Sequence, residues 1–139
     1  MKINSRTKGA SGERQAARAI EEAFGLPHGC LCRNMGEQAR NGKGGDILGI
    51  PGVHIEVKWC KVIHITRWVA QAEADALADD IPVIVYRVDG DTRWRVHFRL
   101  EDSVELMRRV LMVKGKPLFP AERRVYGNRT EAADGGRVE

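Results

Sequence analysis

Three residues near the middle of the chain have the types and spacing that suit phosphodiester hydrolysis. Asp46 precedes a short apolar run, and Glu56 and Lys58 follow ten and twelve positions later. Hydrolysis of a phosphodiester needs an activated water, neutralisation of charge on the phosphate and help for the leaving oxygen, and a carboxylate-bound Mg²⁺ supplies most of these. Lys58 adds a cation that can orient the water or offset phosphate charge.

A hairpin is expected to bring these residues together. Its parts are a strand at 46–50, a turn at Pro51-Gly52 and a strand at 53–60. Alternation along the second strand is strict, so Glu56 and Lys58 project from one face together with His54 and Cys60. Asp46 would then lie beside Glu56 on the neighbouring strand. Two carboxylates so placed repel each other unless a cation lies between them.

Glu13 is expected to add a third carboxylate from a helix. Ser11 can cap a helix that runs to about Phe24, with Ala17 and Ile20 on its apolar stripe. Glu13 lies four positions before Ala17 and therefore on that same inward stripe. A carboxylate on a buried face requires a partner.

The remaining pattern predicts an α/β fold. The further elements are a short strand at 30–34, a loop at 35–45, a helix capped by Thr66 and running to about Asp80, strands at 83–88 and 94–98, and a helix at 101–112. The inward stripe of the middle helix would be Val69, Ala72, Ala76 and Leu77. The order is helix, three strands, helix, two strands, helix, which favours a mixed five-stranded sheet flanked by helices.

Bulk composition predicts one domain. A chain of 139 residues that is 42% hydrophobic fits a single core, which we place at residues 1–113, followed by a basic, partly disordered extension at 114–139. No apolar run approaches the roughly 20 residues of a membrane span, and the polar start lacks a signal peptide. We therefore expect a cytoplasmic protein without a membrane partner, in which the three cysteines stay reduced.

Charge is distributed unevenly in a way that suits a nucleic-acid enzyme. Residues 1–43 hold eight Lys and Arg against four acids, 44–113 hold nine against eleven, and 114–139 hold six against four. A basic front attracts polyanions, while an acidic centre can hold a divalent cation. The candidate DNA-binding residues lie around the first helix start and in the loop that enters Asp46: Arg6, Lys8, Arg14, Arg33, Arg40 and Lys43.

Gly45-Asp46 followed by Glu56-Val57-Lys58 in an apolar strand, with Glu13 on the preceding helix, resembles the PD-(D/E)xK nuclease superfamily. The resemblance covers about residues 5–98, and Gly45 stands where the motif's name has proline. Small size and the basic start are most similar to the archaeal-type Holliday junction resolvases and their phage relatives.

The resemblance implies a restriction-endonuclease-like core and a role for each matching residue. Asp46, Glu56 and the Val57 carbonyl would be ligands of Mg²⁺ or Mn²⁺, with Lys58 as the catalytic lysine. Glu13 would support the metal site, and Gln71, on the next helix, would be a further polar site residue. The substrate class implied is branched, four-way DNA, which a symmetric homodimer would cut in two matched places.

Three other interpretations stay open at this point. The chain can be a different nuclease of the same superfamily, of repair, replication or restriction type, because a metal site does not determine the substrate. It can be a DNA-binding module without catalysis, although the intact set of acids and lysine argues against that. A zinc site from His28, Cys30 and Cys32, with Cys60 or His64, lacks the paired C-x-x-C spacing of strong motifs.

Overall fold

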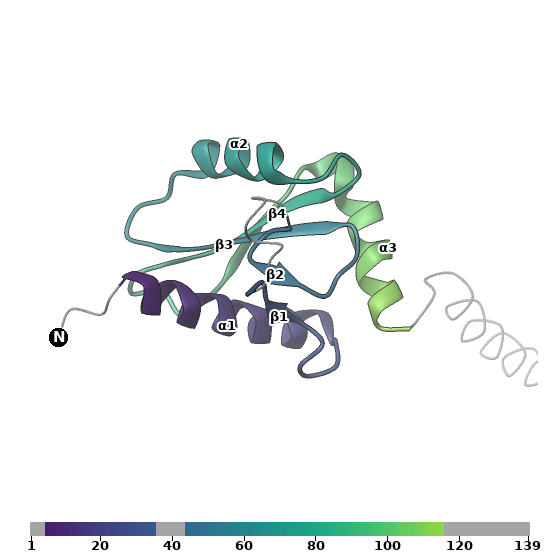
Figure 1. Ribbon diagram of the computed structural model, residues 1–139, viewed down its shortest axis with the longest axis horizontal. Helices are drawn as coiled ribbons and strands as arrows, with labels where there is room; N and C mark the ends of the chain where they lie inside the picture. The colour runs from purple at the N-terminus through teal and green to yellow at the C-terminus, as the bar shows by residue number, and fades with distance from the viewer. Residues whose placement is uncertain (1–4, 36–43, 116–139) are drawn as a thin grey trace, which may run out of the picture.

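A mixed five-stranded sheet with strand order β1-β2-β3-β4-β5 forms the centre of the fold (Figure 1). The computed structural model describes residues 5–35 and 44–115. Its elements are α1 (Ser5–Phe24), β1 (Cys32–Arg33), β2 (Ile47–Leu48), β3 (Val53–Cys60), α2 (Ile65–Asp75), β4 (Ile81–Val88), β5 (Arg95–His97), the 3₁₀ helix η2 (Leu100–Asp102) and α3 (Ser103–Val113). The predicted α/β class and order of elements are confirmed.

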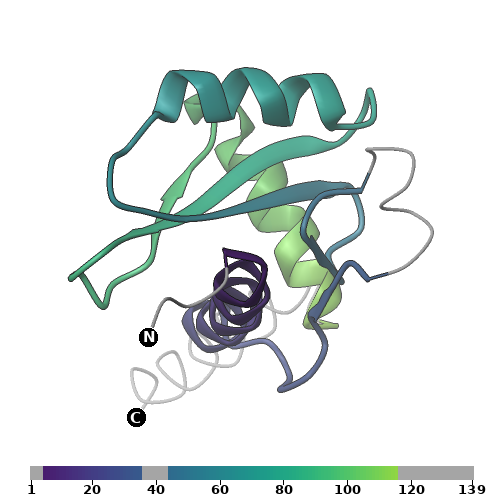
Figure 2. The same cartoon turned by 60° about the vertical axis from the view of Figure 1, so that its left-hand side comes forward.

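The helices cover both faces of the sheet. Helix α2 connects the parallel strands β3 and β4 and lies on one face, whereas α1 and α3 lie on the other (Figure 2). All other neighbouring strands are antiparallel. Because side chains alternate along β3, the strand contributes to the cores on both faces of the sheet. Val53, Ile55 and Val57 belong to the core under α1, and Cys60 packs against the core under α2. None of the helices in the described ranges is long and apolar enough to cross a membrane.

Helix α1 begins earlier than the sequence predicts. It starts at Ser5, and Ser11 is not a cap but an interior residue whose hydroxyl accepts a hydrogen bond from the Gln15 amide at 3.2 Å. Gly12 explains why the extra turns pack: a Cβ there would lie 3.2 Å from the Trp59 ring, so the missing side chain lets the helix approach β3 closely. This tertiary contact outweighs the local signal of a serine cap.

Helix α2 is shorter than predicted, and its inward face agrees with the prediction only in part. It begins at Ile65, so Thr66 lies inside its first turn, and it ends at Asp75, with Ala76 already extended. Of the predicted stripe, Ala72 is buried and Val69 packs against the core under α2. The buried residues are Trp68 and Ala72, whereas Leu77 is 55% exposed. Trp68 takes the core position because it packs on Tyr86 of β4, which rotates the helix relative to the expected stripe. The chain after Asp75 must return at once to begin the parallel strand.

The remaining differences concern the lengths of strands and helices. β1 and β2 are two residues each, shorter than the predicted strands at 30–34 and 46–50. β4 begins at Ile81 because Ile81 and Pro82 pair with the start of β3, and β5 is limited to three residues. α3 begins at Ser103, two residues later than predicted, because η2 precedes it.

Glu21 is a buried carboxylate to which the sequence analysis assigned no role. It is 3% exposed and accepts a hydrogen bond from the Leu31 backbone N–H at 2.9 Å, while the Arg18 guanidinium pairs with its other oxygen. Burial by itself raises the pKa of Glu21, but backbone N–H groups of Leu31 and Gly29 and the Arg18 charge lower it below its usual value. Glu21 therefore ties the loop after α1 to the helix.

Replacing Glu21 with alanine is expected to lower the free energy of unfolding by about 2–4 kcal/mol, since buried backbone donors lose their acceptor. The matched control is Glu22→Ala, because Glu22 is the exposed neighbour on the same helix and should change stability by less than about 0.5 kcal/mol. Urea denaturation followed by circular dichroism measures both. Equal stability of the two variants would contradict the structural role of Glu21.

Candidate active site

Asp46 immediately precedes β2 and lies beside the middle of β3, and its position depends on Gly45. The Asp46 N–H donates to the Ile55 carbonyl at 2.7 Å, and its carboxylate accepts from the Val57 N–H at 2.8 Å. Gly45 has a φ of +69°, and a Cβ there would lie 2.7 Å from the Ile55 carbonyl oxygen. Proline fixes φ near −65° and cannot adopt this backbone. The glycine at the motif's proline position is therefore required by the local structure.

The short β2 leaves a polar edge on β3. Pairing between β2 and β3 registers Ile47 with Ile55, so the residue opposite Val57 would be Gly45, outside the strand. Because the N–H and C=O of one strand residue point to the same neighbour, the Val57 carbonyl faces the edge where its N–H meets Asp46. This arrangement leaves backbone and carboxylate oxygens together at one place.

Asp46 and Glu56 lie close enough that each changes the pKa of the other. Burial, followed by repulsion from Glu56, raises the pKa of Asp46 to about 7, although the Val57 N–H lowers it. The charge of Glu13 adds to this rise, so the three predicted carboxylates are close enough to interact. Burial also acts to raise the pKa of Glu56, but the contacts with His54 and Asp46, and the Lys58 charge, bring it below its usual value. The predicted convergence of Asp46 and Glu56 is what the structure shows.

His54 is a site neighbour that the sequence analysis did not select. It is 1% exposed, and its Nε2 lies 2.8 Å from Glu56 Oε1. Its Nδ1 is buried and has no hydrogen-bond partner among the described residues. The alternation of β3 placed His54 on the same face as Glu56, and that was the signal that could have identified it. His54 positions the Glu56 carboxylate.

Lys58 and Gln71 lie together on the α2 side of the sheet. The Lys58 ammonium donates to the Gln71 side-chain oxygen at 3.2 Å. Lys58 follows Glu56 by two residues in β3 and lowers the pKa of that carboxylate through its charge. The structure therefore brings the expected lysine and glutamine to one place, beside the pair of acids.

Glu13 is turned toward Arg33. The two side chains form an ion pair at 2.6 Å, and each is 22% exposed. Within the ranges 5–35 and 44–115, no three His, Cys, Asp or Glu side chains come close enough together to surround a metal ion. That statement also covers the zinc alternative, whose cysteines Cys30, Cys32 and Cys60 are free. The Glu13 carboxylate, which would complete a cluster of three acids with Asp46 and Glu56, is thus paired with Arg33.

A cavity of about 420 Å³ opens beside these residues. Glu13 and Val57 form part of its wall, whereas Asp46 and Glu56 themselves do not. Three cationic side chains and three rings also line it: Lys8, Lys58, Arg67, Trp59, His64 and Trp68. The cavity lies between the N-terminal parts of α1 and α2, where both helices flank the carboxyl end of β3. It can hold a small anionic group next to the carboxylates.

The predicted DNA-binding residues do not gather at one place in the described part of the chain. Lys8 lines the cavity and pairs with Asp89 at 3.0 Å, and Arg14 is exposed on α1. Arg6 is in α1, but its side chain lies outside what the structure describes. Arg40 and Lys43 also lie outside the described residues, as do residues 116–139 of the predicted extension. Arg67, which the sequence analysis did not select, joins Lys8 in the cavity wall.

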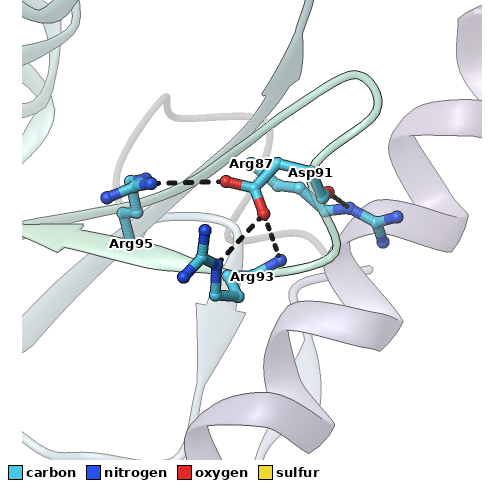
Figure 3. Close-up of polar contacts among 4 residues, drawn as sticks. All are labelled: Arg87, Asp91, Arg93 and Arg95. Atoms are coloured by element: carbon cyan, nitrogen blue, oxygen red, sulfur yellow. Dashed lines mark hydrogen bonds and ion pairs between the residues drawn. The ribbon is translucent and has the colours of Figure 1, made fainter.

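The arginines after β4 are engaged by acids of their own. Asp91 accepts hydrogen bonds from the backbone and side chain of Arg93 and from Arg95, and its backbone carbonyl accepts from Arg87 (Figure 3). Arg93, which precedes β5, and Arg95, the first residue of β5, remain more than half exposed. Arg99 pairs with Glu73 of α2 at 2.7 Å.

Comparison of the chain with family models, curated proteins and solved structures gave no significant match. The candidate site is therefore defined by its own residues: a closely interacting pair of carboxylates, Asp46 and Glu56, with Lys58 beside it.

Proposed function

We propose that this chain is a metal-dependent DNA endonuclease of the PD-(D/E)xK type with a restriction-endonuclease-like core. The observation that carries the proposal is the Asp46–Glu56 pair, in which a half-buried and a buried carboxylate meet across adjacent strands beside the edge of β3. Such a pair is a site for a divalent cation, because a cation removes the repulsion between the two carboxylates. Lys58 lies on the side where a phosphate would approach.

The donor set fits Mg²⁺ or Mn²⁺. Asp46, Glu56 and the Val57 carbonyl present only hard oxygen atoms at the polar edge of β3. When bound, the ion supplies charge neutralisation at the phosphate and activation of a water. Glu13 can support the site once its carboxylate is released from Arg33, and Arg33 is then free to contact a phosphate.

The chain's own residues orient the reaction. His54 holds the Glu56 carboxylate, and the Val57 N–H holds that of Asp46, so both acids are fixed before a ligand arrives. Gln71 holds the Lys58 ammonium beside them, where it can offset charge that builds up on the phosphate or orient the attacking water. Lys8 and Arg67 in the cavity wall can bind the flanking phosphates.

Four-way DNA junctions are the substrate implied by the resemblance to the Holliday junction resolvases, with a homodimer supplying two active sites for the two cuts. A nuclease of repair, replication or restriction type would use the same site on other DNA. The intact acids and lysine disfavour a purely binding module.

Incubation of the protein with labelled four-way junctions, linear duplex and single strands, in Mg²⁺ or in EDTA, tests the proposal. We expect cleavage in Mg²⁺ and none in EDTA. Paired, symmetric cuts in the junction would support a resolvase, and cuts in the other DNAs a different nuclease. Binding of DNA without cleavage of any of them in Mg²⁺ or Mn²⁺ would overturn the proposal of catalysis.

A further inference from the structure

The cavity beside the acidic pair has aromatic walls that contacts to phosphate do not require. Lys8, Lys58 and Arg67 are the cations that the proposed function assigns to phosphate, yet Trp59, Trp68 and His64 also line the cavity. Trp68 is 6% exposed and is part of the core under α2, whereas Trp59 is only partly buried. The Trp59 indole is therefore the ring in this wall that needs a further explanation.

Trp59 is held in a defined place from several sides. Gly12 of α1 packs against its ring, and the Arg87 guanidinium lies 4.6 Å from the ring centre. Arg87 is in turn held by the Gln15 side chain and by the Asp91 carbonyl, the second of which Figure 3 shows. A ring immobilised in this way loses little conformational freedom when a ligand packs against it.

The Lys8 ammonium beside Trp59 points to a ligand that carries both negative charge and a flat ring. It lies 5.4 Å from the ring centre, so positive charge and an aromatic surface occur together. A nucleotide, with its phosphate and its base, matches these two features.

We propose that the cavity binds one unpaired nucleotide of the DNA substrate, with its base against Trp59 and its phosphate near Lys8 and Arg67. This inference rests on the proposed nuclease function and specifies its substrate class. Cavities of roughly 300–1,000 Å³ accept single small molecules, and about 420 Å³ is available here. A base reaches such a cavity only when it has left the duplex stack.

The position of the cavity makes the unpaired nucleotide a neighbour of the scissile phosphate. Glu13, Val57 and Lys58 belong to the same wall as Trp59, and Trp59 directly follows Lys58 in β3. Cleavage is therefore expected at or next to positions where bases are unpaired, such as the centre of a junction, a flap or a gap, and not within continuous duplex.

The test compares a short labelled oligothymidylate with an abasic backbone of the same length, using fluorescence anisotropy in EDTA so that no cleavage occurs. Wild-type protein is expected to bind the base-bearing strand about tenfold more tightly, as stacking on one aromatic side chain provides. Trp59→Leu should bind both strands equally. Trp94→Leu is the matched control, because Trp94 contacts Trp59 edge-on at 6.5 Å but is not part of the cavity wall, and it should keep the preference.

Equal affinity of wild-type protein for the two strands would overturn this inference, and that comparison holds even if Trp59→Leu fails to fold. Loss of the preference in Trp94→Leu but not in Trp59→Leu would also overturn it. Metal-dependent cleavage with equal affinities would leave the nuclease proposal in place and remove only the base site. A base preference without any cleavage would support the site and remove the nuclease proposal.

Discussion

Glu56→Gln is expected to reduce metal-dependent DNA cleavage by at least about a thousandfold while DNA affinity stays within about twofold of wild type. The substitution keeps the size of the side chain but removes the charge that a divalent ion requires, and loss of about 4 kcal/mol of transition-state stabilisation corresponds to that factor. DNA binding is expected to persist because Glu56 is 7% exposed and its carboxylate is held by His54, away from solvent.

Single-turnover cleavage and anisotropy, measured on the same DNA, separate the two effects. Glu73→Gln is the matched control, since Glu73 is an exposed acid of α2 that pairs with Arg99, and it should cleave at the wild-type rate. Lys58→Ala is expected to lose cleavage as severely, because the charge beside Gln71 disappears. Wild-type cleavage by Glu56→Gln or by Lys58→Ala would remove that residue from the active site.

The affinity for Mg²⁺ is expected to increase about thirtyfold between pH 5.5 and pH 8.5. Asp46 must lose its proton before it can bind a cation, and burial together with repulsion from Glu56 raises the pKa of Asp46 to about 7. At pH 5.5 only about one molecule in thirty has this carboxylate ionised, whereas at pH 8.5 almost all do. Titration with Mg²⁺ or Mn²⁺, followed by the shift in melting temperature, measures the change.

The stability of the metal-free protein provides an independent test of the raised pKa of Asp46. The folded pKa of Asp46 lies above its unfolded value, so this group stabilises the fold fully at low pH, and that contribution is lost as pH rises toward and through about 7. In EDTA the free energy of unfolding should therefore fall by about 1–3 kcal/mol as the pH rises from about 4 to about 8. Asp46→Asn should flatten the dependence and be more stable than wild type at pH 8.5. A metal affinity and a free energy of unfolding that both stay constant with pH would contradict the raised pKa of Asp46.

The hairpin of the candidate site could be predicted from sequence because it depends on local rules. Strict alternation over Val53–Cys60 placed Glu56 and Lys58 on one face, and β3 has the predicted bounds. The spacing from Asp46 through the Pro51-Gly52 turn then placed the two acids on adjacent strands. These features follow from a period of two and a short turn, which need no information from the rest of the chain.

Helix ends and inward faces were predicted less well because distant residues decide them. The start of α1 depends on Trp59 packing against Gly12, and the rotation of α2 depends on Trp68 packing against Tyr86. Local propensity is worth only tenths of a kcal/mol per residue, so such contacts override it. The sequence offers no signal for pairs that are far apart along the chain.

The types of the reactive residues, the strand that carries them and the α/β order were determined by the sequence itself, because periodicity and turn chemistry are local. Only the tertiary structure decided which groups control those residues. Arg33 pairs with Glu13, His54 orients Glu56, Gln71 holds Lys58, and Gly45 must be glycine because Ile55 lies against it. Ion pairs and protonation depend on distances and burial between separate elements, and those exist only once the sheet and helices have packed.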